Sequence, residues 1–183
     1  MTEISKLPRT VPRLLLLLAL CCPAASLAEA YAVAGMAIAR IRTDTGATSP
    51  LLADLRLGYR FDRFNLDNHK LELALMPGLR DDNLNQLVTD IPLSTSLFYR
   101  YNVTPHYSIH TDLILGYSRT DVTSSYVNVP EFTDSFHGIS FGVGFEESLK
   151  SIPQLAFKVD IMQLYRGSQL RINTLTLGFR YAF

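Results

Sequence analysis

Apolar and polar residues alternate with a period of two along most of the chain after residue 30. The alternation falls into segments of about ten residues, separated by clusters of turn-forming residues. A period of two predicts strands, because successive side chains of a strand point to opposite faces. Eight strands are predicted, over Tyr31–Ile41, Leu51–Phe61, Lys70–Leu79, Asp90–Asn102, Tyr107–Ser118, Ser135–Glu147, Gln154–Arg166 and Arg171–Phe183.

The two faces of these predicted strands differ in chemistry. One face carries large apolar residues, such as Leu55, Leu57 and Tyr59. The other carries ionisable residues of both signs, namely Asp54, Arg56, Arg60, Glu72, Arg100, His110, Asp112, Glu146, Lys158, Asp160 and Arg180. About ten tilted residues are enough for a strand to cross a bilayer. The pattern predicts an all-β fold, an eight-stranded antiparallel up-and-down transmembrane β-barrel. A soluble lipocalin-like barrel, with the apolar face inside, is the alternative.

The last strand alternates most regularly, with Leu175, Leu177, Phe179, Tyr181 and Phe183 on one face. It resembles the closing strand of bacterial outer-membrane β-barrels, and the whole chain is similar to small barrels of the OmpA and OmpX type. The resemblance implies that Phe179, Tyr181 and Phe183 mark the chain for the barrel-assembly machinery. It also implies the outer membrane of a Gram-negative bacterium, with membrane lipid and lipopolysaccharide as partners.

The N-terminus has basic residues, then a short apolar run and small residues, as in a secretory signal peptide. We expect residues 1–28 to be removed after Ala28, which leaves 29–183 as one barrel domain. A lipid anchor at Cys21 or Cys22 is the alternative, but Leu20 is a poor residue before a lipidated cysteine. Both cysteines lie within the signal peptide, so the mature barrel has no thiol chemistry.

Charge and composition exclude several classes of protein. The chain has 17 basic and 17 acidic residues without a block of one sign, which argues against nucleic acid as a partner. The histidines are scattered, with His69 and His106 in predicted turns, so the sequence predicts no metal and no other cofactor. Balanced charges inside a narrow barrel predict a plug of ion pairs and no porin-like conductance. A narrow pore is kept as an alternative function.

Catalysis requires groups within hydrogen-bond reach, and the candidates lack this spacing. His137 with Ser135 or Ser140, oriented by Glu146, is the arrangement that a lipid A acyltransferase or deacylase would need. However, His137 and Ser140 face opposite sides of a strand, and Glu146 lies roughly 30 Å from His137 at strand rise. His110 and Asp112 share an inner face, where we assign them to the plug. The sequence predicts a protein that is not an enzyme.

The longest predicted loop, residues 119–134, is rich in hydroxyl groups and also contains Tyr126 and Phe132. Apolar residues in an exposed loop suggest a contact surface for an extracellular ligand. Alternatively, these residues continue the two flanking strands above the membrane. The predicted role is therefore structural or surface interaction (adhesion, envelope integrity), carried by the outer loops.

Overall fold

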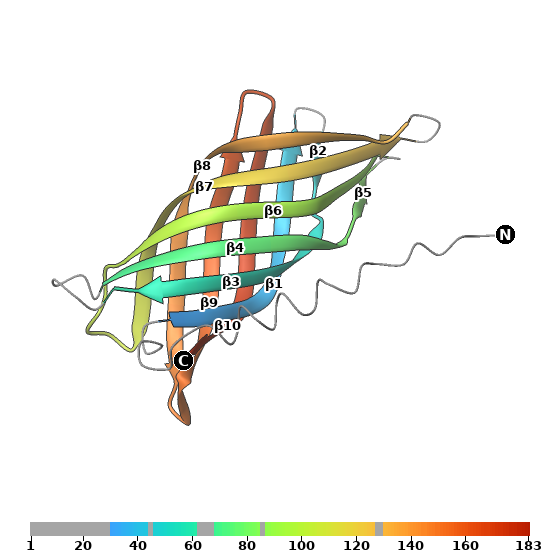
Figure 1. Ribbon diagram of the computed structural model, residues 1–183. Helices are drawn as coiled ribbons and strands as arrows, with labels where there is room; N and C mark the ends of the chain where they lie inside the picture. The colour runs from blue at the N-terminus through green and yellow to red at the C-terminus, as the bar shows by residue number, and fades with distance from the viewer. Residues whose placement is uncertain (1–29, 44–45, 62–67, 85–86, 127–129) are drawn as a thin grey trace, which may run out of the picture.

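The computed structural model describes residues 30–43, 46–61, 68–84, 87–126 and 130–183. It is a closed antiparallel barrel of eight long strands (Figure 1), which confirms the predicted fold class. These strands are β1 (Ala30–Thr43), β3 (Leu51–Arg60), β4 (His69–Arg80), β6 (Leu87–Asn102), β7 (Ile109–Tyr126), β8 (Phe132–Leu149), β9 (Ile152–Arg166) and β10 (Leu170–Ala182). Two short strands, β2 (Gly46–Thr48) and β5 (Asp82–Leu84), pair with β1 and β6. The predicted signal peptide and residues 127–129 of the predicted loop lie outside the described residues.

The barrel closes by pairing its first strand with its last. The ladder between β1 and β10 is continuous from the Tyr31–Ala182 pair to the Thr43–Leu170 pair, and the Phe183 amide donates to the Ala30 carbonyl at 3.1 Å. Gly35 lies opposite Gly178 in this seam, and a Cβ added at Gly35 would lie 2.6 Å from the Gly178 Cα. The two strands therefore approach more closely here than side chains allow. We call the barrel end that holds Ala30 and Phe183 the terminal end, and the opposite end the distal end.

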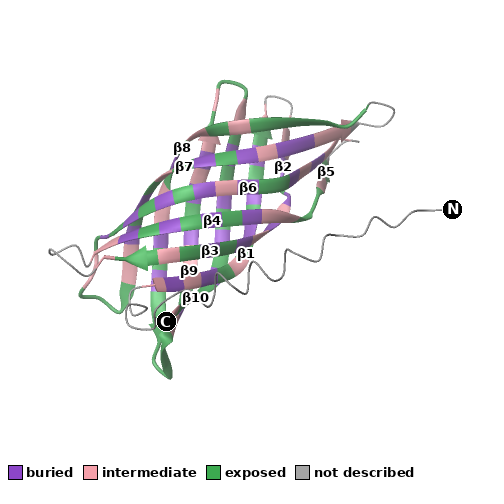
Figure 2. Cartoon of the chain, viewed as in Figure 1, coloured by how far each residue is buried: buried purple, intermediate pink, exposed green. Residues whose placement is uncertain are grey.

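Exposed and buried residues alternate along the strands (Figure 2). The exposed face carries large apolar side chains around the barrel, for example Leu57 at 66 % exposure, Leu115 at 56 % and Leu177 at 49 %. The inner face buries charged residues, including Asp54, Glu72 and Arg100. This arrangement rules out the lipocalin-like alternative, which requires the apolar face inside. In the described part of the chain no helix is long and apolar enough to cross a membrane.

The prediction of a loop over residues 119–134 is wrong for most of its length. β7 continues to Tyr126 and β8 begins at Phe132, with paired residues up to Ser124 and Phe132. Thr120, Val122 and Thr123 are β-branched, and such residues favour strands even where hydroxyl groups suggest a loop. The flanking strands therefore continue into a long hairpin, as the alternative interpretation stated. At the terminal end, Tyr107 precedes β7, which begins two residues later than predicted.

Candidate functional site

The centre of the lumen is a cluster of fully buried ion pairs contributed by four strands. Arg56 of β3 contacts Glu72 at 3.0 Å and Asp160 at 2.7 Å. Arg100 of β6 contacts Asp160 at 2.9 Å, through both terminal nitrogens, and Glu72 at 3.3 Å. Lys158 adds a 2.6 Å contact to Glu72. Buried charges are costly unless they are paired, so this cluster depends on every member.

A second set of ion pairs lies closer to the terminal end. The Asp112 carboxylate forms ion pairs with Arg100 at 2.9 Å and with Lys70 at 3.2 Å. The Glu146 carboxylate forms ion pairs with Arg180 at 2.9 Å and with Lys70 at 3.5 Å. On the other side of the central cluster, Asp54 pairs with Arg56 at 2.8 Å. The structure thus brings nine of the eleven residues singled out for the plug into ion pairs: Asp54, Arg56, Glu72, Arg100, Asp112, Glu146, Lys158, Asp160 and Arg180.

Sequence reasoning missed two residues that bind to these carboxylates in the lumen, Lys70 and Tyr31. Lys70 lies on the inner face of β4, two residues before Glu72. Tyr31 points inward from β1, and its hydroxyl donates to Glu72 at 3.0 Å. Both follow the period of two that identifies their inner-facing neighbours. Lys70 is the first residue of a predicted strand, and its face was not assigned. Tyr31 was not assigned because an aromatic residue suits either face of such a strand.

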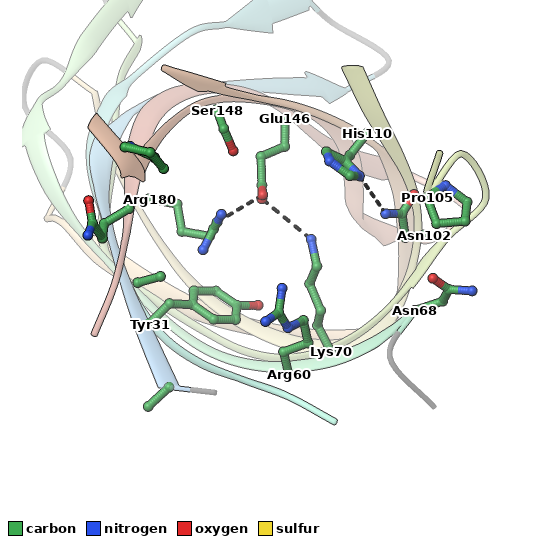
Figure 3. A pocket seen from close by; sticks show the side chains of 14 residues that line it. Tyr31, Arg60, Asn68, Lys70, Asn102, Pro105, His110, Glu146, Ser148 and Arg180 are labelled. Atoms are coloured by element: carbon green, nitrogen blue, oxygen red, sulfur yellow. Dashed lines mark hydrogen bonds and ion pairs between the residues drawn. The ribbon is translucent and has the colours of Figure 1, made fainter. Parts of the chain in front are cut away.

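Arg60 and His110 lie outside the ion-pair cluster, at a cavity of about 480 Å³ that opens at the terminal end (Figure 3). Arg60 is exposed there and forms no ion pair with a described residue. His110 shares a 2.8 Å hydrogen bond with Asn102 and forms no ion pair with a described residue, so its assignment to the ion-pair plug is wrong. Water reaches this last layer of the barrel, so its charged groups need no buried partner.

The distal half of the lumen holds an apolar cluster among buried hydroxyl groups, which the sequence did not predict. It contains Ala37, Ala39, Ile41, Leu52, Ala74, Met76, Ile91, Phe98, Ile114, Val122, Met162, Leu164 and Ile172. Beside this cluster, the Ser96 hydroxyl donates to Ser118 at 2.7 Å, and Ser118 donates to Ser140 at 3.0 Å. The inner face is therefore charged towards the terminal end and carries apolar side chains and hydroxyl groups towards the distal end. An eight-stranded barrel is narrow enough for such side chains to fill.

We expect purified protein in planar bilayers to give no large, stable single-channel currents. The expectation follows from the fully buried Arg100, Phe98 and Met76 side chains, which occupy the lumen between its two ends. Currents should be recorded over the same voltage range as for a general porin, which serves as the positive control. Stable currents of porin size would contradict the closed lumen.

The candidate catalytic residues do not converge. Ser140 is buried and bonded to Ser118, whereas His137 is exposed and its ring lies 6.4 Å from that of Tyr117. Ser135 donates to Asp121 at 2.5 Å. Glu146 pairs with Lys70 and Arg180 nearer the other end of the barrel. No hydrogen bond joins His137 to a serine among the described residues.

The described residues contain no group of three metal-ligating side chains. His69 contacts the Tyr99 hydroxyl, and its ring lies 5.0 Å from that of Tyr101. His106 is exposed in the turn between β6 and β7. Neither residue has a carboxylate partner in the part of the chain that the structure describes.

Aromatic residues surround the terminal end on the outer face. Phe179, Tyr181 and Phe183 are about half exposed, at 49 %, 48 % and 55 %. Phe179 packs edge-on against Phe157 with ring centroids 5.7 Å apart, and Tyr59 lies in the same region on β3. Such a belt is typical of the level where a membrane meets water. A role of the last three aromatics as an assembly signal remains a prediction.

Together, the apolar outer face, the aromatic belt and the ion-paired lumen define a small transmembrane β-barrel of the bacterial outer membrane. Residues 14–183 match the family described as "Outer membrane protein beta-barrel domain", and the chain belongs to this family. It lies in the outer membrane of a Gram-negative bacterium. No curated protein matches the sequence.

Solved structures of small outer-membrane barrels share the fold. Ail of Yersinia pestis, solved with the heparin analogue sucrose octasulfate, is 15% identical with a TM-score of 0.61, covering 85% of this chain and 98% of its own. Neisserial surface protein A is 15% identical with a TM-score of 0.65, covering 84% and 97%. OprG of Pseudomonas aeruginosa is 14% identical with a TM-score of 0.58, covering 85% and 96%. At these identities the likeness shows the fold alone.

Proposed function

We propose that the protein is a non-catalytic surface barrel that contacts an extracellular ligand through the long hairpin of β7 and β8. The observation that carries this proposal is an unpaired strand edge. β9 pairs with β8 only from Phe141 to Leu149, whereas β7 pairs with β8 up to Phe132. Among the described residues, the segment 132–140 of β8 therefore pairs with a strand on one side only.

An unpaired edge presents backbone N–H and C=O groups that can bond to another strand. An extended peptide that pairs with such an edge gains main-chain hydrogen bonds, while its side chains meet those of the edge strand. Phe132, His137 and Ile139 are exposed on this segment, with Ile139 at 69 %. The segment thus fits an extended segment of a host or envelope protein. The descriptions of Ail as an attachment protein and of the Neisserial protein as a surface protein support a surface role.

We expect the double substitution Asp134→Lys and His137→Lys to reduce ligand contact without unfolding the barrel. Lysines on an edge strand oppose pairing with a further strand, and both positions are exposed. The measurement is adhesion of expressing bacteria to cultured cells and their survival in serum. Deleting residues 123–131, which shortens the hairpin, should have the same effect.

The matched control is Asp81→Lys with Asn83→Lys, because it changes charge equally at exposed distal positions outside the edge. Gel mobility of unboiled samples shows whether each variant folds. Equal adhesion by the edge variant, the deletion and the wild type would refute the proposal. An equal loss in the control would show that general charge is responsible and that the edge is not.

A further inference from the structure

Three arginines form one row on the outer face at the distal end. Arg42 of β1 lies directly opposite Arg171 of β10, and Arg171 lies directly opposite Arg166 of β9. All three are exposed. Residues directly opposite in antiparallel strands have Cβ atoms about 4.5–5.5 Å apart, so the central Arg171 has a like charge on either side.

A β-bulge brings Arg166 into this row. The ladder between β9 and β10 pairs Tyr165 with Ile172 and Gln163 with Asn173, which leaves Leu164 as the extra residue. Beyond the bulge, Tyr165 packs inward against Phe136 with ring centroids 5.3 Å apart, and Arg166 is exposed opposite Arg171. By uninterrupted alternation, Arg166 would share the inner face of Lys158 and Asp160. Bulges commonly re-aim a side chain in this way.

The row has no acidic partner among the described residues. No ion pair there joins Arg42, Arg166 or Arg171 to a carboxylate. Arg119, an exposed arginine on β7, instead lies 3.5 Å from Asp121. Like charges directly opposite one another destabilise a sheet. An anion from outside the chain would relieve this repulsion.

The arginine row lies above the apolar band and is separated from it by one polar row. On the outer face of the same strands, Ile38, Leu175 and Ile161 are 49 %, 42 % and 56 % exposed. Between them and the arginine row is a polar row in which Asn173 pairs with Arg40 on one side and Gln163 on the other. Arg42 and Arg171 also line a hollow of about 300 Å³ with Thr43, Ser168, Gln169 and Leu170. The arginines are therefore at the level of lipid headgroups.

We propose that Arg42, Arg166 and Arg171, with Arg40 below them, bind the phosphate groups of lipopolysaccharide in the outer leaflet. Outer-membrane barrels have short periplasmic turns and longer extracellular connections. Here the short turn between β8 and β9 lies at the terminal end and the long β7–β8 hairpin at the distal end, so the termini lie in the periplasm and the distal end faces that leaflet. Arginine binds phosphate through two parallel hydrogen bonds, and several arginines in a row suit a headgroup with more than one phosphate. The acyl chains of the same lipid would lie against Ile38, Leu175 and Ile161.

The test is a titration of the full-length refolded barrel in detergent, read by native mass spectrometry as bound lipid per barrel. The probes are bisphosphorylated lipid A, dephosphorylated lipid A and phosphatidylglycerol. We expect bisphosphorylated lipid A to bind at least about tenfold more tightly than the other two. Arg171→Gln should weaken its binding about fivefold, and the triple variant R42Q/R166Q/R171Q about a hundredfold. Arg119→Gln, the matched control, should change it less than about twofold.

The site would be overturned if Arg171→Gln and Arg119→Gln had the same effect. Equal binding of phosphatidylglycerol and lipid A would overturn the choice of lipopolysaccharide, because any anionic lipid would then suffice. A second measurement is independent of affinity. In detergent without lipid A, Arg171→Gln should raise the unfolding temperature, since it removes like-charge repulsion, and lipid A should stabilise it less than the wild type. The single variant keeps the test valid if the triple variant does not fold.

Discussion

Replacing Arg100 with Met is expected to destabilise the barrel by about 3–5 kcal/mol, the range for removing one partner from a buried ion pair. Met keeps much of the length of the side chain and removes its charge. Without the guanidinium group, Asp112 keeps only the 3.2 Å contact to Lys70. Asp160 loses the two hydrogen bonds that the terminal nitrogens of Arg100 donate. The measurement is urea unfolding of the barrel in phospholipid vesicles, compared with the wild type.

The matched control for this substitution is Arg119→Met on the neighbouring strand β7. The Arg119 side chain is 63% exposed and lies 3.5 Å from Asp121. Exposed ion pairs contribute little, so this variant should lose less than about 1 kcal/mol. Equal losses in the two variants would show that the buried ion pairs do not hold the lumen together.

Replacing Gly35 with Ala is expected to weaken the closing seam by about 1–3 kcal/mol, as overpacking does elsewhere. The new methyl group would lie 2.6 Å from the Gly178 Cα and would meet the Leu177 carbonyl. Both are backbone atoms, so relief requires movement of β10 away from β1. Unboiled gel mobility and urea unfolding in vesicles measure the effect.

Gly138→Ala on β8 is the control for the seam variant. A Cβ there would have the Tyr165 ring at 3.5 Å as its nearest neighbour, which is an ordinary contact. Its stability should stay within about 0.5 kcal/mol of the wild type. If both alanine variants behaved alike, close approach of β1 and β10 would not explain the glycine pair.

The sequence predicts the barrel well because the period of two directly reports which face each residue occupies. Glu72, Arg100 and Asp160 could be placed inside by counting alternate positions from apolar neighbours. The bulge at Leu164 could not be predicted in this way, since it depends on how β9 pairs with β10. The arginine row escaped sequence reasoning for the same reason.

Residue type alone gives a wrong or ambiguous prediction where a residue suits two environments. Residues 119–126 are rich in hydroxyl groups, which suggested a loop, yet they pair with β8 as a strand. Small apolar residues such as Ala37 and Ala39 did not indicate which face of the strand they occupy, and in the structure they line the distal lumen. Packing against distant strands decided these cases, and a single sequence does not display it.

The pairing of β1 with β10 also determines how the barrel can form. These strands come from opposite ends of the described chain, so their contacts have the greatest sequence separation in the sheet. Contacts of this kind form slowly, because the entropy of a long loop is lost before they are made. Until the seam closes, both strands expose unpaired backbone groups that lipid cannot satisfy. Folding and membrane crossing are therefore coupled in one cooperative step, and an open sheet has no stable place in the bilayer.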